Sequence, residues 1–531
     1  MTSTINKNIS KFNLKLLFIL LAIAIIIGVS FRGFQLERKV YWHDEVYTSM
    51  RAAGYTRQEI DRELFQNRFI AAPELQKYQK VKPGSTAADT INSLAIEDPQ
   101  HPPFYFLIAR FWMQQFGSSR TASRSLPALL SLLSLPLIYG LAWELFASHW
   151  AALFATTFLA LSPFDILFAQ TARQYSLLAV TVIGSSWLLL RAIRLQIVKN
   201  WGFYALAIAL GFYTHPFFSL TLIGQGAFII CHKNFISNQT TISKFFLAIT
   251  AALILYTPWI FVLINNFKRA ADTTAWTQIF PGFSYLLKLW LLSFTALFID
   301  FDFGFNSVGT YLLRLPFLLL IIVALYKVYR RTSRSTSLFI LTSIFVPFLI
   351  LALPDIILGG KRSAVSRYLV SCFPGIQLAV AYLLATKIQT HQWFWRLVLV
   401  ALLTSSIASC TVSAFSDTWW SKDLSYYNAE VAKIINKNET NATVATTSTI
   451  VISDHGNDFT NMGDFISLSY LFDKNVQLLL MSDSPNFDLL KSNTEFFVFR
   501  PSEKLRSAII EQKQGRLESI LDYAELWKLK R

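Results

Sequence analysis

Long apolar segments alternate with short polar ones over most of the chain. The first apolar segment runs from Leu16 to about Phe31. Because roughly 20 apolar residues cross the hydrocarbon layer as a helix, segments of about this length predict membrane-spanning helices. We expect a mainly α-helical polytopic membrane protein with about eleven spans, near residues 16–31, 125–142, 150–168, 175–191, 201–215, 217–231, 245–264, 311–327, 337–354, 367–386 and 396–413.

Two further apolar segments, 103–117 and 283–299, fit this pattern poorly. The first is short and carries Arg110 at its centre, and a central arginine is costly in the hydrocarbon layer. The second is barely long enough to cross and carries Lys288. We interpret both as interfacial helices. The basic residues of the loops fit equally well an alternative in which both segments cross, which gives thirteen spans.

Two polar regions lie outside these spans. Residues 34–100 form a long loop of mixed charge, whose pattern predicts short amphipathic helices on the membrane surface. From Ala414 onward the long apolar segments stop, and short apolar runs at 443–452, 476–481 and 496–499 alternate with helical patterns such as 428–436. This alternation predicts a small α/β domain with a partly parallel sheet. We therefore expect a membrane domain over 1–413 and a soluble domain over 414–531.

Charge indicates the orientation and excludes one class of partner. The formal net charge is +16, and residues 414–531 contain 13 Lys/Arg against 16 Asp/Glu, so residues 1–413 carry +19. Basic residues of a membrane domain mark cytoplasmic loops or meet lipid phosphates, and the chain has no basic stripe of the kind that binds nucleic acid. Lys7, Lys11 and Lys15 precede the first span. We expect a multi-pass protein of the plasma (inner) membrane with a cytoplasmic N-terminus and an extracytoplasmic C-terminal domain.

An acid pair, Asp44-Glu45, follows the first span and lies among Tyr41, Trp42 and Tyr47. Aromatic side chains with a polar edge favour the bilayer boundary, so we expect this pair at a partly desolvated site. A carboxylate in such a place can act as a general base. The alternative is a solvated loop in which the two acids have no chemical role.

Three further polar clusters lie at span ends that the eleven-span topology places outside. They comprise His101, which Pro102 and Pro103 fix at a helix start, then Arg173 with Tyr175, and finally Lys361, Arg362 and Arg367. Such cations and hydroxyls bind phosphate groups. With the acid pair they suit a reaction between a lipid phosphate and a hydroxyl or amine acceptor. Taken singly, each cluster has a plain alternative: a helix cap, an arginine that reaches headgroups, or a loop that binds lipid nonspecifically.

The ordered set of these motifs resembles the GT-C glycosyltransferases over roughly residues 10–415. Within them it most resembles the glycosyltransferase 39 type, which is related to protein O-mannosyltransferases and to the aminoarabinose transferases that modify lipid A. The residues that carry the resemblance are Asp44-Glu45, His101-Pro102-Pro103, Arg124-Ser-Leu-Pro127, Leu161-Ser-Pro163, Ala172-Arg173-Gln-Tyr175, and Arg367-Tyr368 with Pro374.

The resemblance implies a membrane enzyme that moves a sugar from a polyprenyl-phosphate donor to a lipid, protein or glycan acceptor at the outer membrane face, with inversion at the anomeric carbon. By position, Asp44 would be the catalytic acid/base residue, with Glu45 beside it. His101 lies where the aminoarabinose branch has a phosphate-binding lysine, which is a departure from that pattern. The donor-phosphate candidates are His101, Arg173, Tyr175, Lys361, Arg362 and Arg367.

A metal cofactor and a different function class are the remaining alternatives. Asp300 and Asp302 could together bind a divalent cation, but a turn-forming role for them is favoured, so we expect no cofactor. A transporter or flippase of polyprenyl-linked saccharides would need ionisable residues deep within spans and paired inverted repeats. The sequence shows no such repeat. A third interpretation is a sensor or assembly protein whose tail recruits partners.

Overall fold

The computed structural model describes residues 2–232, 239–389, 393–440, 449–456, 460–490, 496–513 and 516–530. The chain forms two compact units, each built from three segments of the sequence. Unit 1 comprises Met1–Leu36, Asp98–Tyr105 and Arg124–Phe415, and unit 2 comprises Glu37–Glu97, Phe106–Ser123 and Ser416–Arg531.

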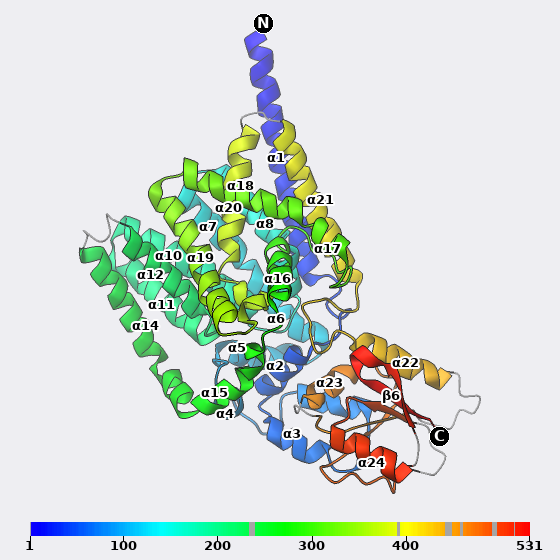
Figure 1. The fold of residues 1–531 in the computed structure, drawn as a ribbon. Coiled ribbons are helices and arrows are strands. Elements are labelled where there is room, and N and C mark those ends of the chain that lie inside the picture. The colour runs from blue at the N-terminus through cyan, green and yellow to red at the C-terminus, as the bar shows by residue number, and fades with distance from the viewer. Residues whose placement is uncertain are drawn as a thin grey trace. The chain divides into compact units, whose positions relative to one another are not determined.

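Unit 1 is a bundle of helices (Figure 1). Helix α10 packs against α7 and α11, α12 packs against α19, and α8 packs against α7 and α20. The elements are α1 (Thr2–Gly33), α6 (Arg120–Leu132), α7 (Ser134–Phe146), α8 (His149–Ala160), α9 (Pro163–Ala169), α10 (Tyr175–Leu195), α11 (Val198–Thr214), α12 (Phe218–Cys231), α14 (Gln239–Asn265), α15 (Phe267–Thr274), η2 (Ala275–Gln278), α16 (Phe283–Thr295), α17 (Val308–Leu312), α18 (Leu315–Arg331), α19 (Arg334–Ile357), η3 (Arg362–Ala364), η4 (Ser366–Leu369), α20 (Phe373–Gln389) and α21 (Trp393–Phe415).

The predicted fold class is confirmed. Within the described part of the chain, seven helical segments are long and apolar enough to cross a membrane, or eight if the bent pair α8–α9 counts as one span. The remaining predicted spans, 201–215, 217–231 and 367–386, coincide with the shorter helices α11, α12 and α20. The last of these begins at Phe373, because its predicted start forms the separate 3₁₀ turn η4.

The two segments interpreted as interfacial both form helices of 13 residues, α5 (Phe104–Phe116) and α16. A helix of this length spans roughly 20 Å, less than the hydrocarbon thickness of about 30 Å. In α16, the ammonium of Lys288 lies over the rings of Phe305 and Tyr311, at 5.1 and 5.5 Å from their centres. Whether either helix crosses the membrane stays a prediction.

The bend of 55° between α8 and α9 has a local chemical cause. Pro163 opens α9 and cannot donate the backbone hydrogen bond that would continue α8. The carbonyls of Leu159 and Ala160 are instead bound by the buried guanidinium of Arg32, at 2.9 and 2.5 Å. The Ser162 side chain caps α9. Arg32 therefore serves the end of a helix within the bundle.

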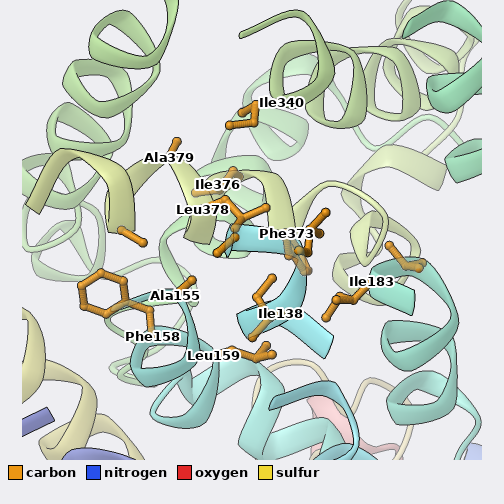
Figure 2. Close-up of a cluster of buried hydrophobic side chains, with 14 of the residues drawn as sticks. Ile138, Ala155, Phe158, Leu159, Ile183, Ile340, Phe373, Ile376, Leu378 and Ala379 are labelled. Atoms are coloured by element: carbon orange, nitrogen blue, oxygen red, sulfur yellow. The ribbon is translucent and has the colours of Figure 1, made fainter. Parts of the chain in front are cut away.

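Unit 1 contains a large cluster of buried aliphatic and aromatic side chains. Side chains that lie far apart in the sequence meet in it (Figure 2). Burial of each large aliphatic side chain contributes about 1.5–3 kcal/mol to folding or association. The cluster includes Ile138, Ala155, Phe158, Leu159, Ile183, Ile340, Phe373, Ile376, Leu378 and Ala379.

Unit 2 contains a six-stranded mixed sheet with the strand order β1-β3-β2-β4-β6-β5. Strand β2 runs parallel to β3 and β4, so the predicted partly parallel sheet is present. The strands are β1 (Arg68–Ala71), β2 (Ile450–Ser453), β3 (Gln477–Leu480), β4 (Phe496–Phe499), β5 (Arg516–Leu521) and β6 (Leu526–Lys530). The helical elements of unit 2 are α2 (His43–Ala53), α3 (Arg57–Leu64), η1 (Ala72–Gln79), α4 (Ala87–Glu97), α5, α22 (Asn428–Thr440), α23 (Asn461–Leu468), α24 (Glu503–Lys513) and η5 (Asp522–Ala524).

The long first loop contributes an edge strand to this sheet. Strand β1 pairs antiparallel with β3, with Arg68 opposite Leu480 and Ala71 opposite Gln477. The loop also forms helices α2, α3 and α4, as its amphipathic pattern predicts. Their position on a membrane surface stays a prediction, as does the domain boundary at 413/414. What the structure adds is that the loop and the tail share one sheet.

Arg110 of α5, whose charge is unfavourable in the hydrocarbon layer, is hydrogen-bonded within unit 2. Its side chain is buried, and its Nη2 donates to the backbone oxygen of Ser85 at 2.6 Å and to the Ser85 hydroxyl at 2.9 Å. A buried guanidinium needs such partners, because its desolvation is otherwise uncompensated. Arg110 therefore ties α5 to the loop before α4.

Candidate functional site

Two polar side chains of unit 1, those of His101 and Tyr175, lie next to His215, which is in the turn between α11 and α12. The centres of the His215 and Tyr175 rings lie 5.7 Å apart, and those of His215 and His101 lie 6.2 Å apart. His101 Nδ1 is in turn 3.2 Å from the amide nitrogen of the buried Gln174. The two sequence-predicted residues His101 and Tyr175 therefore both lie next to His215.

Positive charge surrounds this group. The guanidinium of Arg173 lies over the Tyr175 ring, 5.7 Å from its centre. Burial lowers the pKa of His215 well below its usual value, and electrostatic interactions with His101, Arg173 and Arg367 lower it further. The sign follows from charge, because nearby cations and loss of water both disfavour the protonated ring. His215 is therefore a neutral imidazole among cations.

A series of ring contacts connects His215 with the cations near residue 367. The ring centres of His215 and Phe217 lie 5.2 Å apart, and those of Phe217 and Tyr368 lie 4.3 Å apart. The Arg367 guanidinium lies 5.6 Å from the Tyr368 ring centre. These contacts bring segments that are about 150 residues apart in sequence into one neighbourhood.

Trp276 on η2 lies close to two cations, Lys361 and Arg367. Its ring centre is 5.1 Å from the Lys361 ammonium and 5.9 Å from the Arg367 guanidinium. Cations within about 6 Å of an aromatic face are attracted by its quadrupole, and indole is the strongest such partner. Trp276 thus holds two like charges near each other. Arg362 follows Lys361 on η3 and is half-buried.

A buried acid, Asp355, fixes the loop that carries Lys361. Asp355 accepts hydrogen bonds from the backbone nitrogen and the hydroxyl of Ser363, at 2.6 and 2.7 Å. Gly360 has φ +151°, and a Cβ there would lie 2.6 Å from Asp355 Oδ1. Only glycine fits this close approach. The position of Lys361 therefore depends on Asp355 and Gly360.

We call this set the cationic cluster. It unites five of the six donor-phosphate candidates from the sequence, and Arg362 adjoins it. Its members are His101, Arg173, Gln174, Tyr175, His215, Trp276, Lys361, Arg367 and Tyr368.

The acid pair belongs to unit 2, where both residues lie in the first turn of α2. Glu45 is fully buried, and its Oε2 accepts hydrogen bonds from the Trp42 backbone nitrogen at 2.9 Å and from the Lys422 ammonium at 3.1 Å. The Lys422 side chain is buried as well. Asp44 is half-buried, one residue earlier on the helix. The contacts of Glu45 fix the start of α2 against the tail.

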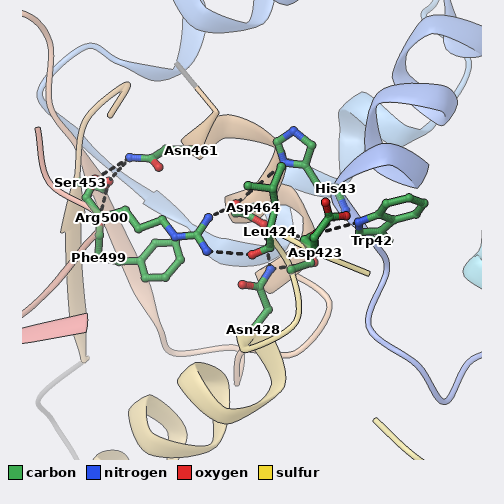
Figure 3. Close-up of polar contacts among 12 residues, drawn as sticks. Trp42, His43, Asp423, Leu424, Asn428, Ser453, Asn461, Asp464, Phe499 and Arg500 are labelled. Carbon is green, nitrogen blue, oxygen red and sulfur yellow. Dashed lines mark hydrogen bonds and ion pairs between the residues drawn. The ribbon is translucent and has the colours of Figure 1, made fainter. Parts of the chain in front are cut away.

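A second buried acid, Asp464 on α23, strengthens the attachment of α2 to the tail (Figure 3). Its carboxylate accepts hydrogen bonds from Ser425 at 3.0 Å and Asn428 at 3.1 Å, and pairs with Arg500. Ser425 also accepts a hydrogen bond from the His43 backbone nitrogen at 2.9 Å. A satisfied buried network of this kind fixes one arrangement of the segments that contribute to it.

Of the Asp300–Asp302 pair, Asp300 has a structural role as the partner of a buried arginine. Asp300 is buried, and its Oδ1 accepts a hydrogen bond from Arg314 Nη2 at 2.7 Å. Among the described residues, no group of three or more His, Cys, Asp or Glu side chains is arranged to hold a metal ion. The absence of a cofactor nevertheless stays a prediction.

Sequence reasoning missed His215, Trp276, Lys422 and Asp464. One signal was available for His215, because the dipeptide His215-Pro216 repeats His101-Pro102. Trp276, a lone tryptophan after the predicted span at 245–264, has no comparable signal. Neither do Lys422 and Asp464, which are single charged residues in a polar tail. Their partners come from distant parts of the sequence.

Comparisons with known proteins bear on the family and on the fold. Residues 100–261 match the model of the family described as dolichyl-phosphate-mannose-protein mannosyltransferase. The matched segment contains His101, Arg173, Tyr175 and His215, and excludes Asp44. The comparison with curated proteins found no match.

Two solved structures are similar over most of the chain. ArnT from Cupriavidus metallidurans in the apo state is 13% identical, covers 98% of each chain and gives a TM-score of 0.53. The apo oligosaccharyltransferase of Archaeoglobus fulgidus is 12% identical, covers 87% of this chain and 64% of that chain, and gives a TM-score of 0.50. At identities this low, the structural similarity establishes the fold alone. The resemblance noted in the sequence is therefore confirmed: this chain has the fold of the GT-C glycosyltransferases, and its residues 100–261 match a mannosyltransferase family of that superfamily.

Proposed function

We propose that this protein is a glycosyltransferase that moves a sugar from a polyprenyl-phosphate donor to a lipid, protein or glycan acceptor at the outer membrane face, with inversion at the anomeric carbon. The GT-C fold and the family match support the enzyme class. The cationic cluster of unit 1 is the observation that carries the proposal.

The chemistry of the cluster suits a lipid phosphate. A phosphate that leaves a sugar develops negative charge on its oxygens, and fixed cations and N–H or O–H donors stabilise that charge. Arg173, Lys361 and Arg367 supply charge, and Tyr175 supplies a hydroxyl. The two cations that contact Trp276 are held near each other before any ligand arrives. Less reorganisation is then needed when the phosphate leaves.

In the proposed reaction, the acceptor oxygen or nitrogen forms a bond to the anomeric carbon as the bond from that carbon to the phosphate oxygen breaks. The electron pair of the broken bond leaves with the polyprenyl phosphate, and the acceptor proton passes to the Asp44 carboxylate. A single displacement of this kind inverts the anomeric carbon and requires one base. The proposed leaving group is bound by the cationic cluster.

The two acids of the pair divide their roles in this proposal. Glu45 is committed to Trp42 and Lys422, and positions the start of α2. Asp44 lies in the same turn with its side chain half-buried, which suits a base that must meet an acceptor. We assign the catalytic role to Asp44 and a positioning role to Glu45.

Direct binding tests the proposal without knowledge of the sugar. Purified full-length protein is titrated with a polyprenyl phosphate and, separately, with the matching polyprenol. We expect at least tenfold tighter binding of the phosphate, and Arg367→Gln is expected to remove most of that difference. Arg191→Gln, which removes a cation that contacts Trp187 outside the cluster, is the matched control. Equal binding of phosphate and alcohol, or unchanged binding by Arg367→Gln, would contradict the proposal.

A further inference from the structure

His215 is buried, with 4% of its surface exposed, in a turn that Pro216 helps to fix. A buried imidazole retains one N–H donor that needs a partner, and such groups are almost always hydrogen-bonded. Its ring contacts alone do not explain a histidine, because phenylalanine would make similar contacts with Tyr175 and Phe217.

The backbone fixes which ring nitrogen carries the proton. The Phe217 N–H donates a hydrogen bond to His215 Nδ1 at 3.1 Å. Nδ1 is therefore the acceptor, and the neutral ring carries its hydrogen on Nε2. Among the described residues, none accepts a hydrogen bond from Nε2. The ring therefore presents one N–H donor of fixed identity.

The surroundings of this donor select the charge of its partner. His101, Arg173 and Arg367 all act electrostatically on His215, and the ring centre of Tyr175 lies 5.7 Å from that of His215. Such an environment repels cations and attracts anions with several acceptor oxygens. A neutral N–H adds a hydrogen bond to such an anion without adding charge.

We propose that His215 is a further donor-binding residue, whose Nε2–H donates a hydrogen bond to a phosphate oxygen of the polyprenyl-phosphate donor. This inference rests on the proposed function and deepens it, since it names a neutral contact among the charged ones. The role requires the Nε2–H and not a positive charge. A side chain that places an amide nitrogen near the Nε2 position should therefore replace it.

Three variants of the full-length protein separate this role from packing. His215→Gln places an amide near Nε2, His215→Asn places one near Nδ1, and His215→Phe keeps a ring without a donor. With a polyprenyl phosphate as the probe, we expect His215→Phe and His215→Asn to raise Kd about tenfold, and His215→Gln to stay within about threefold of the parent. In a transfer assay His215→Phe and His215→Asn should raise KM for the donor more than they lower kcat. His149→Phe, at a ring stacked on Trp143, is the matched control and should bind as the parent does.

Each outcome has a defined meaning. Parental affinity in His215→Phe would overturn the inference and leave the proposed function intact. Equal losses in His215→Gln and His215→Asn would indicate a packing role and would also overturn it. If His215→Phe does not fold, the comparison of the Gln and Asn variants decides. Failure of the parent to prefer phosphate over polyprenol would overturn the proposed function itself, and is seen before any variant is made.

Discussion

At the scale of single residues, neighbours in the sequence have different environments and therefore different roles. Glu45 is 0% exposed and shares its oxygen between a backbone nitrogen and Lys422. Asp44, one position earlier, is only half-buried. The acid pair is visible in the sequence. Which of the two acids binds Lys422 is not, because 377 positions separate that lysine from Glu45.

The Glu45–Lys422 pair gives a prediction about stability. Removal of one partner leaves an uncompensated buried charge, which costs about 3–5 kcal/mol. We expect Glu45→Gln and Lys422→Met each to lower the free energy of unfolding by about this amount, and the double variant to lose clearly less than the sum of the two. The exposed ion pair of Lys433 with Asp417 is the control, and Lys433→Met should change stability little. Additive losses in the double variant would show that the two side chains do not stabilise each other.

At the scale of elements, the long helices and the strands of the tail could be predicted, whereas β1 could not. The apolar runs near 476–481 and 496–499 match β3 and β4 because strand-length runs of large apolar residues identify buried strands. Strand β1 has only four residues, Arg68–Ala71, and one buried apolar side chain. Pairing with β3, and not local preference, defines it as a strand.

Strand β1 gives a second prediction. Ile70 is 3% exposed in unit 2, whereas the preceding Phe69 is 37% exposed. Truncation of a buried isoleucine costs about 2–5 kcal/mol, through lost burial and the cavity left behind. We expect Ile70→Ala to lower the unfolding temperature and to speed proteolysis within the first loop, and Phe69→Ala to have a clearly smaller effect. Similar effects of both variants would mean that β1 is not held through its buried face.

At the scale of the whole molecule, each compact unit is assembled from distant segments of the chain. The sequence suffices for the mainly helical fold and for the partly parallel sheet of the tail, because periodicity carries that information. That the cationic residues bind phosphate stays a prediction. The sequence does not show that the loop around Ile70 folds with the tail. His215 and Trp276 were also missed, since their importance lies in tertiary contacts alone.

The measurement that tests the central claim most directly is the release of polyprenyl phosphate during sugar transfer. Purified protein is incubated with a panel of polyprenyl-phosphate hexoses and pentoses and with envelope acceptors, and the lipid and glycosylated products are quantified by mass spectrometry. We predict that the parent consumes at least one donor and forms a product of inverted anomeric configuration. Asp44→Asn should slow release by at least about a hundredfold, the usual contribution of a general base, with unchanged affinity for polyprenyl phosphate. Turnover of Asp44→Asn at the parental rate, or a product of retained configuration, would contradict the account.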